Sequence, residues 1–282
     1  MPNIAYVNGR FLPLEEATVS IEDRGFQFGD GVYEVVRVYG GIPFRLGEHL
    51  SRFTQSMEAI GISSPLDHTE WEAIIREGLQ RSAYSECKVY IQITRGVAPR
   101  DHLFPKGSSP TFVMTFREMA NLPVHMVEEG VVVVTRPDLR WARCSIKSLN
   151  LLPNLLAKQE ANQAGAFEAI LIKDGLVTEG TSSNVVVVKS GALLTPPLSD
   201  QLLAGVTRQA VLELAKGQGL GVEERAVREE ELGQADELFL IGTTIEVLPI
   251  STLNEKPVGL KSPGEITLHL REKFQDLVQH KP

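Results

Sequence analysis

The sequence predicts an α+β protein of two domains, and three observations support that prediction. The chain has 282 residues, 43% of them apolar, which is enough for two modest hydrophobic cores. Segments with strand periodicity and segments with helical periodicity occur in both halves. The composition changes around Met119 to Pro123. We therefore expect an N-terminal α+β domain over residues 1–118, a linker over 119–123 and a C-terminal α+β domain over 124–282.

Two hairpins are expected at the start of the first domain. Ala5 to Leu12 alternate around Asn8-Gly9, a pair that readily takes the two positive φ angles of a type I′ turn. Tyr33 to Tyr39 form a β-rich run, Gly40-Gly41 supply a second turn, and Ile42 to Leu46 form the returning strand.

Two helices and a long loop complete the first domain. The first helix starts at about Glu48, and Arg52 lies off its apolar stripe; the second carries Trp71. Strands over Lys88 to Thr94 and Thr111 to Phe116 then flank the irregular segment RGVAPRDHLFPKGSSP, whose glycines and prolines preclude regular structure. Long ordered loops in compact domains are often functional, although the residues alone also allow a simple surface excursion.

The second domain is expected to contain four main strands and three helices. Runs such as VVVV indicate strands that are buried on both faces. The predicted strands cover Val131 to Thr135, Ala169 to Ile172, Asn184 to Val188 and Glu237 to Ile241, and the helices cover about Pro153 to Gln163, Thr207 to Lys216 and Glu265 to Val278.

The charge and cysteine content argue against several classes of partner. The formal net charge of −8 comes from acidic and basic residues scattered along the chain, so we expect no nucleic-acid partner. No apolar run approaches the ~18 residues of a membrane span, and the N-terminal residues do not resemble a signal peptide. The chain has only two cysteines, Cys87 and Cys144, and they lack CxxC spacing. So few cysteines, without a disulfide or zinc pattern, are typical of a protein in a reducing compartment. We therefore expect a cytoplasmic protein without membrane contact.

Common catalytic motifs are missing from the sequence. The chain has no P-loop motif, no HExxH and no GxSxG elbow. Its six histidines are dispersed without metal-ligand spacing, so no metal site is expected. The stretch Gly217 to Gly221 faintly resembles a dinucleotide loop, but it follows a predicted helix, and we interpret it as a helix stop and turn.

Three segments remain as candidates for a functional site. They read RGFQFGDGVYEVVRVY (24–39), SIKSLNLLPNLLAKQEA (145–161) and VTEGTSSNV (177–185). Together, and over essentially the whole chain up to GTTIEVLPI (242–250), they resemble the fold-type IV enzymes that use pyridoxal 5′-phosphate (PLP). That family includes D-amino acid aminotransferases, branched-chain aminotransferases and 4-amino-4-deoxychorismate lyases. The resemblance implies a two-domain fold of this type, with the cofactor between the domains.

The resemblance assigns the two central cofactor residues. Lys147 precedes an apolar stretch, and desolvation lowers the pKa of a lysine toward the neutral amine that attacks an aldehyde. By residue type alone it would be a surface lysine; the resemblance implies that it holds PLP as a Schiff base. Glu179 would likewise be a solvated turn carboxylate, whereas the resemblance pairs it with the pyridine nitrogen, which it keeps protonated. Ser182 and Ser183 would support the site through hydrogen bonds.

Further residues match the family's phosphate and ring contacts. Helix N-termini bind phosphate through backbone N–H groups and the helix dipole, and Gly205 precedes a predicted helix. Leu203 would pack against the cofactor ring. The implied phosphate contacts are Arg52, Val206, Thr207, Thr243 and Thr244.

The long loop offers a trap for the substrate carboxylate. A guanidinium donates two parallel hydrogen bonds to a carboxylate, and the stretch RGVAPRDHLFP contains Arg100 and His102. It resembles the loop of the D-amino acid aminotransferase subgroup, where this pair comes from the neighbouring subunit and acts with the tyrosine that matches Tyr33. A homodimer is therefore implied. Asp101 departs from that pattern, and its charge would weaken the trap if it pointed inward.

The implied reaction moves an amino group from a D-amino acid to an α-keto acid, with Lys147 carrying the proton from Cα to the cofactor C4′ carbon. Two enzymes of the same fold remain as alternatives, an L-branched-chain aminotransferase and a 4-amino-4-deoxychorismate lyase. A non-catalytic binding protein that has kept the fold is a further alternative. The Arg100 and His102 loop argues against the first two, and the presence of both Lys147 and Glu179 argues against the third.

Overall fold

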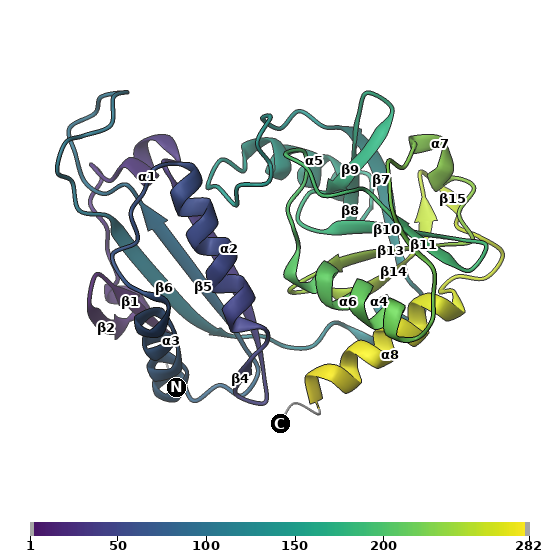
Figure 1. Cartoon of the computed structure of the whole chain (residues 1–282), viewed down its shortest axis with the longest axis horizontal. Helices are drawn as coiled ribbons and strands as arrows, with labels where there is room; N and C mark the ends of the chain where they lie inside the picture. The colour runs from purple at the N-terminus through teal and green to yellow at the C-terminus, as the bar shows by residue number, and fades with distance from the viewer. Residues whose placement is uncertain (1–2, 280–282) are drawn as a thin grey trace. The chain divides into compact units, whose positions relative to one another are not determined.

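The computed structural model describes residues 3–279 and divides into two compact units (Figure 1). The first unit runs to Ala120 and also includes Ile146–Asn150. The second comprises Asn121–Ser145 and the residues from Leu151 onward. The short segment Ile146–Asn150, which contains Lys147, is therefore packed with the N-terminal part of the chain.

An antiparallel sheet of six strands, in the order β2-β1-β6-β5-β3-β4, forms the first unit. The predicted hairpin at Asn8-Gly9 is confirmed, with φ angles of 43° and 97°. The second hairpin is shorter than predicted on its return side, because the following helix already begins at Leu46. The strands are β1 (Ile4–Val7), β2 (Arg10–Pro13), β3 (Gly31–Tyr39), β4 (Ile42–Pro43), β5 (Cys87–Thr94) and β6 (Thr111–Glu118).

Helices cover this sheet and close its core. After a 3-10 turn at Leu14–Glu16, the helices are α1 (Arg24–Phe28), α2 (Leu46–Ala59) and α3 (His68–Ser82). Helix α2 lies along β3, and its side chains Phe53 and Met57 are fully buried, as their helical spacing predicts. Helix α3 begins with a capping box between Asp67 and Glu70, and its Trp71 packs edge-on against Phe53.

The second unit contains a mixed sheet of nine strands, in the order β12-β11-β10-β13-β14-β7-β8-β9, with β15 beside β14. The pairs β14–β7, β7–β8 and β11–β12 are parallel, and the other pairs are antiparallel. The strands are β7 (Val131–Pro137), β8 (Glu168–Lys173), β9 (Leu176–Gly180), β10 (Asn184–Lys189), β11 (Ala192–Thr195), β12 (Val222–Glu224), β13 (Glu237–Gly242), β14 (Glu246–Leu253) and β15 (Lys256–Pro257).

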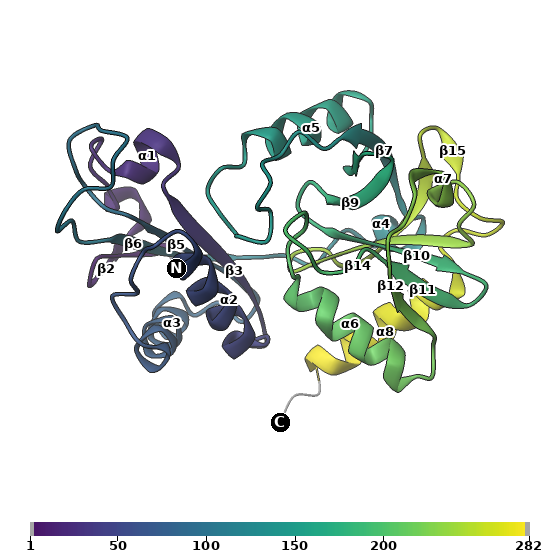
Figure 2. The ribbon, with the colours of Figure 1, turned by 45° about the horizontal axis from the view of Figure 1, so that its top comes forward.

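In the described part of the second unit, five helices pack around this sheet (Figure 2). Helix α5 contacts β7 and β8. Helices α6 and α8 contact each other and β13, and α8 also contacts β14. Helix α6 ends at Gly217, so the glycine-rich stretch after it is the predicted helix stop. The helices are α4 (Val124–Glu128), α5 (Leu152–Gln163), α6 (Val206–Gly217), α7 (Glu229–Leu232) and α8 (Glu265–Gln279).

The two VVVV runs differ in burial. In β10, all four valines are at most 2% exposed, as predicted for a strand covered on both faces. In β7, Val131 and Val133 are buried, but Val132 is 36% exposed. The prediction of burial on both faces is therefore wrong for Val132, whereas Val134 on the same face is buried against α5.

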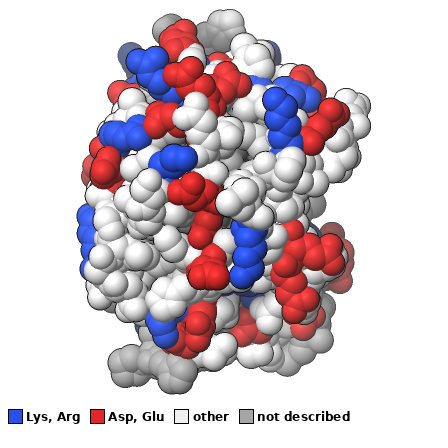
Figure 3. Space-filling view, turned by 90° about the vertical axis from the view of Figure 1, so that its right-hand side faces the viewer, with Lys and Arg blue, Asp and Glu red and all other residues white. Residues whose placement is uncertain are grey.

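Acidic and basic side chains are interspersed on the face of the molecule that Figure 3 shows. Over residues 3–279, no helix combines the length and the apolar composition that crossing a bilayer requires.

Candidate active site

Lys147 reaches the first unit because its segment pairs with the beginning of β3. The backbone N–H of Tyr33 donates to the carbonyl of Lys147, and the N–H of Leu149 donates to the carbonyl of Gly31, both at 3.0 Å. The Lys147 N–H in turn donates to the Ser56 hydroxyl of α2 at 3.2 Å. These bonds hold the backbone of Lys147 between β3 and α2, although it lies more than 90 positions further along the chain than Ser56.

The side chain of Lys147 lies over an aromatic ring. Its Nζ is 4.4 Å from the ring centroid of Tyr33, which is stacked on Tyr90 at 5.6 Å between centroids. Burial raises the pKa of Tyr90 to about 12, so this supporting ring stays neutral at physiological pH. The structure thus brings together two of the predicted site residues, the lysine and the tyrosine.

Arg52 is anchored by a carboxylate inside the first unit. Its Nε and Nη2 donate to Glu34 at 2.9 and 2.7 Å, and the Nδ1 of His49 lies 3.1 Å from the same carboxylate. Burial raises the pKa of Glu34, but the Arg52 charge and His49 outweigh it and hold that pKa well below its usual range. Burial dominates at His49 and lowers its pKa. The predicted phosphate ligand Arg52 is therefore a buried, fixed cation.

Sequence reasoning missed Glu34 and His49, although one signal was present. Val32, Glu34 and Val36 alternate on one face of β3, and all three are fully buried. A carboxylate at an inward position of a buried strand requires a cationic partner. The nearby helix with Arg52 supplied the obvious candidate.

The loop with Arg100 and His102 is ordered by ion pairs on its inner side. Asp30 pairs with Arg24 at 2.7 Å and with Arg95 at 2.9 Å. Burial raises the pKa of Asp30, but hydrogen bonds from the two arginines lower it overall, so it stays ionised. Arg24 also donates to the carbonyl of Asp101 at 2.6 Å. The carboxylate of Asp101 accepts from the N–H of Leu103 at 3.0 Å, so it is engaged within its own loop.

Arg100 and His102 are both exposed and both contact Phe28 of α1. The Arg100 guanidinium lies 4.4 Å from the centroid of that ring and donates to the carbonyl of Gln27 at 3.3 Å. The His102 ring packs edge-on against Phe28 at 5.7 Å. The aromatic side chain therefore gathers the two predicted carboxylate ligands at one place in the loop.

Glu179 in the second unit is buried and surrounded by donors. Its Oε2 accepts from the N–H of Leu203 at 3.0 Å and from the amide of Asn184 at 3.2 Å. Its Oε1 accepts from Arg140, which sequence reasoning missed. Asn184 also donates to the carbonyl of Leu203 at 3.1 Å, which ties that loop to β10. Two predicted cofactor residues, Glu179 and Leu203, are thus directly bonded.

The N-terminus of α6 has the features of an anion site. Gly205 is its N-cap, and in the described chain no side chain caps the helix, so the N–H groups of the first turn remain available to an outside acceptor. A Cβ at Gly205 would lie 2.2 Å from Asn184 Oδ1, so a glycine is needed for this approach. Val206 and Thr207 are buried in the first turn.

The other predicted polar residues are placed as follows. Thr243 and Thr244 form the half-buried turn between β13 and β14. The hydroxyls of Ser182 and Ser183 donate to the buried Glu168 at 3.2 and 3.4 Å, and that of Thr181 donates to the same carboxylate. The serine hydroxyls therefore shape their own turn.

The donor set matches what PLP requires. PLP needs an amine for its aldehyde, an anion for its ring nitrogen and N–H donors for its phosphate. The structure provides Lys147, the buried Glu179 and the uncapped N-terminus of α6. The residues present therefore fit this cofactor.

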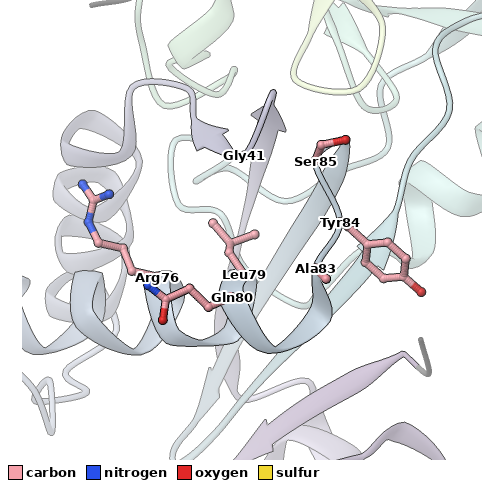
Figure 4. Close-up of a pocket in the computed structure, with 7 residues that line it drawn as sticks. All are labelled: Gly41, Arg76, Leu79, Gln80, Ala83, Tyr84 and Ser85. Carbon is pink, nitrogen blue, oxygen red and sulfur yellow. The ribbon is translucent and has the colours of Figure 1, made fainter.

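A separate pocket in the first unit lies at the end of α3, beside the turn between β3 and β4 (Figure 4). Its lining includes none of the predicted site residues; it consists of Gly41, Arg76, Leu79, Gln80, Ala83, Tyr84 and Ser85. Within residues 3–279, no cluster of three or more His, Cys, Asp or Glu side chains is suited to a metal ion.

Comparison with known proteins identifies the family. Residues 31–253 match the family model of class IV amino-transferases. The D-alanine aminotransferase of Bacillus licheniformis is 44% identical over 96% of this chain and 95% of its own length. That of Staphylococcus epidermidis is 39% identical over 97% of each.

Solved structures agree with this result. The T.th. branched-chain amino acid aminotransferase with pyridoxamine 5′-phosphate has a TM-score of 0.92 and 30% identity, and the match covers 100% of this chain and 96% of that one. The Escherichia coli branched-chain enzyme has a TM-score of 0.92 and 26% identity, over 99% and 95%. These neighbours confirm the predicted fold-type IV architecture. The family model covers most of this chain, and the relatives match nearly its full length. This chain therefore belongs to the class IV amino-transferases.

Proposed function

We propose that the protein is a PLP-dependent D-amino acid aminotransferase that transfers the amino group of D-alanine and similar D-amino acids to 2-oxoglutarate. The observation that carries this proposal is a difference in identity. The D-alanine aminotransferases are 38–44% identical over nearly the full chain, whereas the branched-chain enzymes of known structure are 25–30% identical. The shared fold does not distinguish these substrates, so sequence identity carries more weight here.

When bound, PLP supplies an aldehyde that condenses with amines and a protonated ring that withdraws electrons from the substrate Cα. Lys147 provides the amine for that aldehyde. With the cofactor bound, the free Lys147 amine would act as the general base and acid that moves the proton of the substrate Cα. Glu179 is fixed by Arg140, Asn184 and the Leu203 N–H, and it holds the proton on the ring nitrogen.

The phosphate and the ring of the cofactor have different contacts in this proposal. The buried Arg52 and the first turn of α6 bind the phosphate, because both present fixed positive charge or N–H groups. The Thr243-Thr244 turn adds hydroxyls. Leu203, whose N–H donates to Glu179, would pack on the cofactor ring. Ser182 and Ser183, held by Glu168, present the backbone of their turn to the site.

Arg100, His102 and Tyr33 bind the substrate α-carboxylate and thereby select the D-enantiomer. For Lys147 to remove the Cα proton, the Cα–H bond must face its amine, and the position of the carboxylate then decides which hand fits. The Asp101 carboxylate accepts a hydrogen bond from the Leu103 N–H, so the proposal gives it no direct contact with the substrate.

The protein acts as a homodimer in which each loop serves the site of the neighbouring subunit. Support comes from apolar side chains exposed on and beside this loop, since exposed apolar patches mark interaction surfaces. Phe26 is 74% exposed, Leu103 77% and Phe104 63%.

The protein is placed in the cytoplasm in this proposal. The two buried free thiols of Cys87 and Cys144 support this, because disulfides are rare in a reducing compartment.

A panel of D- and L-amino acids tests the proposal, each assayed with 2-oxoglutarate and with pyruvate. D-alanine is expected to be the better donor. The similarity to branched-chain enzymes of known structure makes L-leucine the second candidate donor, and a preference for it would reject D-specificity. An absorbance band from bound PLP that does not change on adding any amino acid would indicate a binding protein instead.

A further inference from the structure

Three charged side chains form a buried row in the second unit. The guanidinium of Arg140 lies between two carboxylates: its Nη2 is 2.7 Å from Asp138 Oδ2 and its Nε is 2.9 Å from Asp138 Oδ1, while its Nη1 bonds to Glu179. The side chains of Asp138, Arg140 and Glu179 are only 4%, 5% and 8% exposed. Charges in the row are therefore poorly screened by water and act strongly on one another.

Further hydrogen bonds fix the geometry of the row. Thr178 of β9 donates its hydroxyl to Asp138 Oδ2 at 2.7 Å, and the Arg140 N–H donates to Asp138 Oδ1 at 3.0 Å. Arg140 Nη2 also donates to the carbonyl of Gln201 at 3.0 Å. The guanidinium is consequently held in place and cannot turn wholly toward either carboxylate.

The protonation states of Asp138 and Arg140 follow from their contacts. Burial raises the pKa of Asp138, but its hydrogen bonds with Arg140 lower it below the usual range. Burial lowers the pKa of Arg140, but Asp138 and Glu179 outweigh it and raise it further above its usual range. The nearby thiol of Cys144 has its pKa raised to about 11 by burial, so it is neutral at physiological pH.

One positive charge is therefore shared by two carboxylates. The remaining donors to Glu179 named above, the Leu203 N–H and the Asn184 amide, are neutral. The more of the Arg140 charge Asp138 neutralises, the more basic Glu179 becomes, and the more firmly Glu179 holds a proton on a partner opposite it.

We propose that Asp138, acting through Arg140, tunes how strongly Glu179 holds the proton on the cofactor's ring nitrogen. This inference rests on the proposed role of Glu179 in PLP binding. Asp138 and Arg140 are positioning residues in this scheme, since neither needs to touch the cofactor or the substrate.

Asp138→Asn and Arg140→Gln are expected to shift the titration midpoints in opposite directions. Asp138→Asn removes the competing anion, leaves the Arg140 charge on Glu179 and lowers the titration midpoint of the Glu179 carboxyl and of the ring nitrogen. Arg140→Gln removes the cation and raises both, with a shift of about one pH unit or more. Arg140→Lys keeps the charge, so both midpoints are expected to stay near those of the unaltered protein.

Two NMR measurements test the scheme. In the holoenzyme loaded with PLP labelled with ¹⁵N in the ring, the ¹⁵N chemical shift reports protonation of the ring nitrogen as a function of pH. In the full chain without PLP, the ¹³C shift of the Glu179 carboxyl, assigned by its loss in Glu179→Gln, reports the carboxyl alone. Opposite displacements by Asp138→Asn and Arg140→Gln support the proposal.

Displacements of the same sign, or none, would overturn it, because a merely structural role predicts that both variants disturb the site alike. If Arg140→Gln does not fold, Asp138→Asn compared with Arg140→Lys suffices: equal midpoints in these two variants contradict the tuning role. If the carboxyl shifts as expected but the ring nitrogen does not respond, Glu179 does not contact the ring, and the proposed function of Glu179 fails instead.

Discussion

Arg52 donates hydrogen bonds of 2.9 and 2.7 Å to both oxygens of Glu34, and the Glu34 side chain is fully buried in β3. Replacing Glu34 by Gln leaves the Arg52 charge without its anion. Breaking a buried pair in this way costs about 3–5 kcal/mol of folding free energy. We expect a loss of that order in chemical denaturation. The control is Glu77→Gln, which removes an exposed pair with Arg81 and should cost less than about 1 kcal/mol.

The pH dependence of stability provides a second test of the same pair. Because the pKa of Glu34 is lower in the folded chain than in the unfolded chain, its contribution is fully present above the unfolded pKa of about 4.3. It is lost as the pH falls from there toward the folded pKa. When the pH is lowered from about 6 to about 3, the free energy of unfolding should therefore fall less for Glu34→Gln than for the unaltered protein. Equal acid sensitivity of the two proteins would show that the pair does not contribute in this range.

Lys147→Ala is expected to abolish turnover and the absorbance of covalently bound PLP while the far-ultraviolet circular dichroism stays unchanged. The reason is that only this amine is proposed to bond the aldehyde. Borohydride reduction followed by peptide mapping should tag Lys147 in the unaltered protein. Lys189→Ala, which alters an exposed lysine of β10, serves as the control and should keep full activity. A tag on Lys158 instead would show that the assignment is wrong.

Glu179→Gln is expected to retain PLP but to slow transamination strongly. The neutral amide cannot stabilise a protonated ring nitrogen, so electron withdrawal from the substrate Cα weakens. Single-turnover kinetics with D-alanine, together with the cofactor content of the purified variant, provide the measurement. Turnover close to that of the unaltered protein at full PLP occupancy would contradict the role given to this carboxylate.

Arg100→Ala should lower kcat/KM for D-alanine by roughly ten- to more than a hundredfold, which corresponds to about 1.5–3 kcal/mol for a charge-assisted hydrogen bond. The matched control is Arg76→Ala, since Arg76 is an exposed arginine of α3 that pairs only with Glu72 among the ion pairs of the described residues. Steady-state assays with D-alanine, L-leucine and 2-oxoglutarate decide the outcome. If kcat/KM for D-alanine were the same in Arg100→Ala and in the unaltered protein, the branched-chain alternative would be favoured.

Mixing two inactive variants tests whether the loop serves the neighbouring subunit. The Lys147→Ala chain keeps its loop, and the Arg100→Ala, His102→Ala double variant keeps its lysine. A mixed dimer then contains one complete site and one site that lacks both contributions, so random mixing should restore about a quarter of the activity. The mixture must be unfolded and refolded together. Activity no higher than the sum of the separate variants would place each loop at its own subunit's site.

Local patterns in the sequence determined much of the secondary structure and the membership of the family. The Asn8-Gly9 turn, the apolar stripe of α2 and the end of α6 at Gly217 depend on neighbours within a few residues, so their periodicity and turn chemistry are visible in the chain. The motifs around Lys147 and Glu179 likewise lie in continuous segments, and they are sufficient to recognise the class IV amino-transferases.

Only the tertiary structure decided what these residues touch. The Ile146–Asn150 segment pairs with the start of β3, Glu34 fixes Arg52, and Arg140 lies between Asp138 and Glu179. Some of these partners are near neighbours and others lie far apart in the chain, and their separations follow no helical or strand period. Such contacts form because burying a charge or a backbone group requires a partner, and which partner is available depends on how distant segments pack.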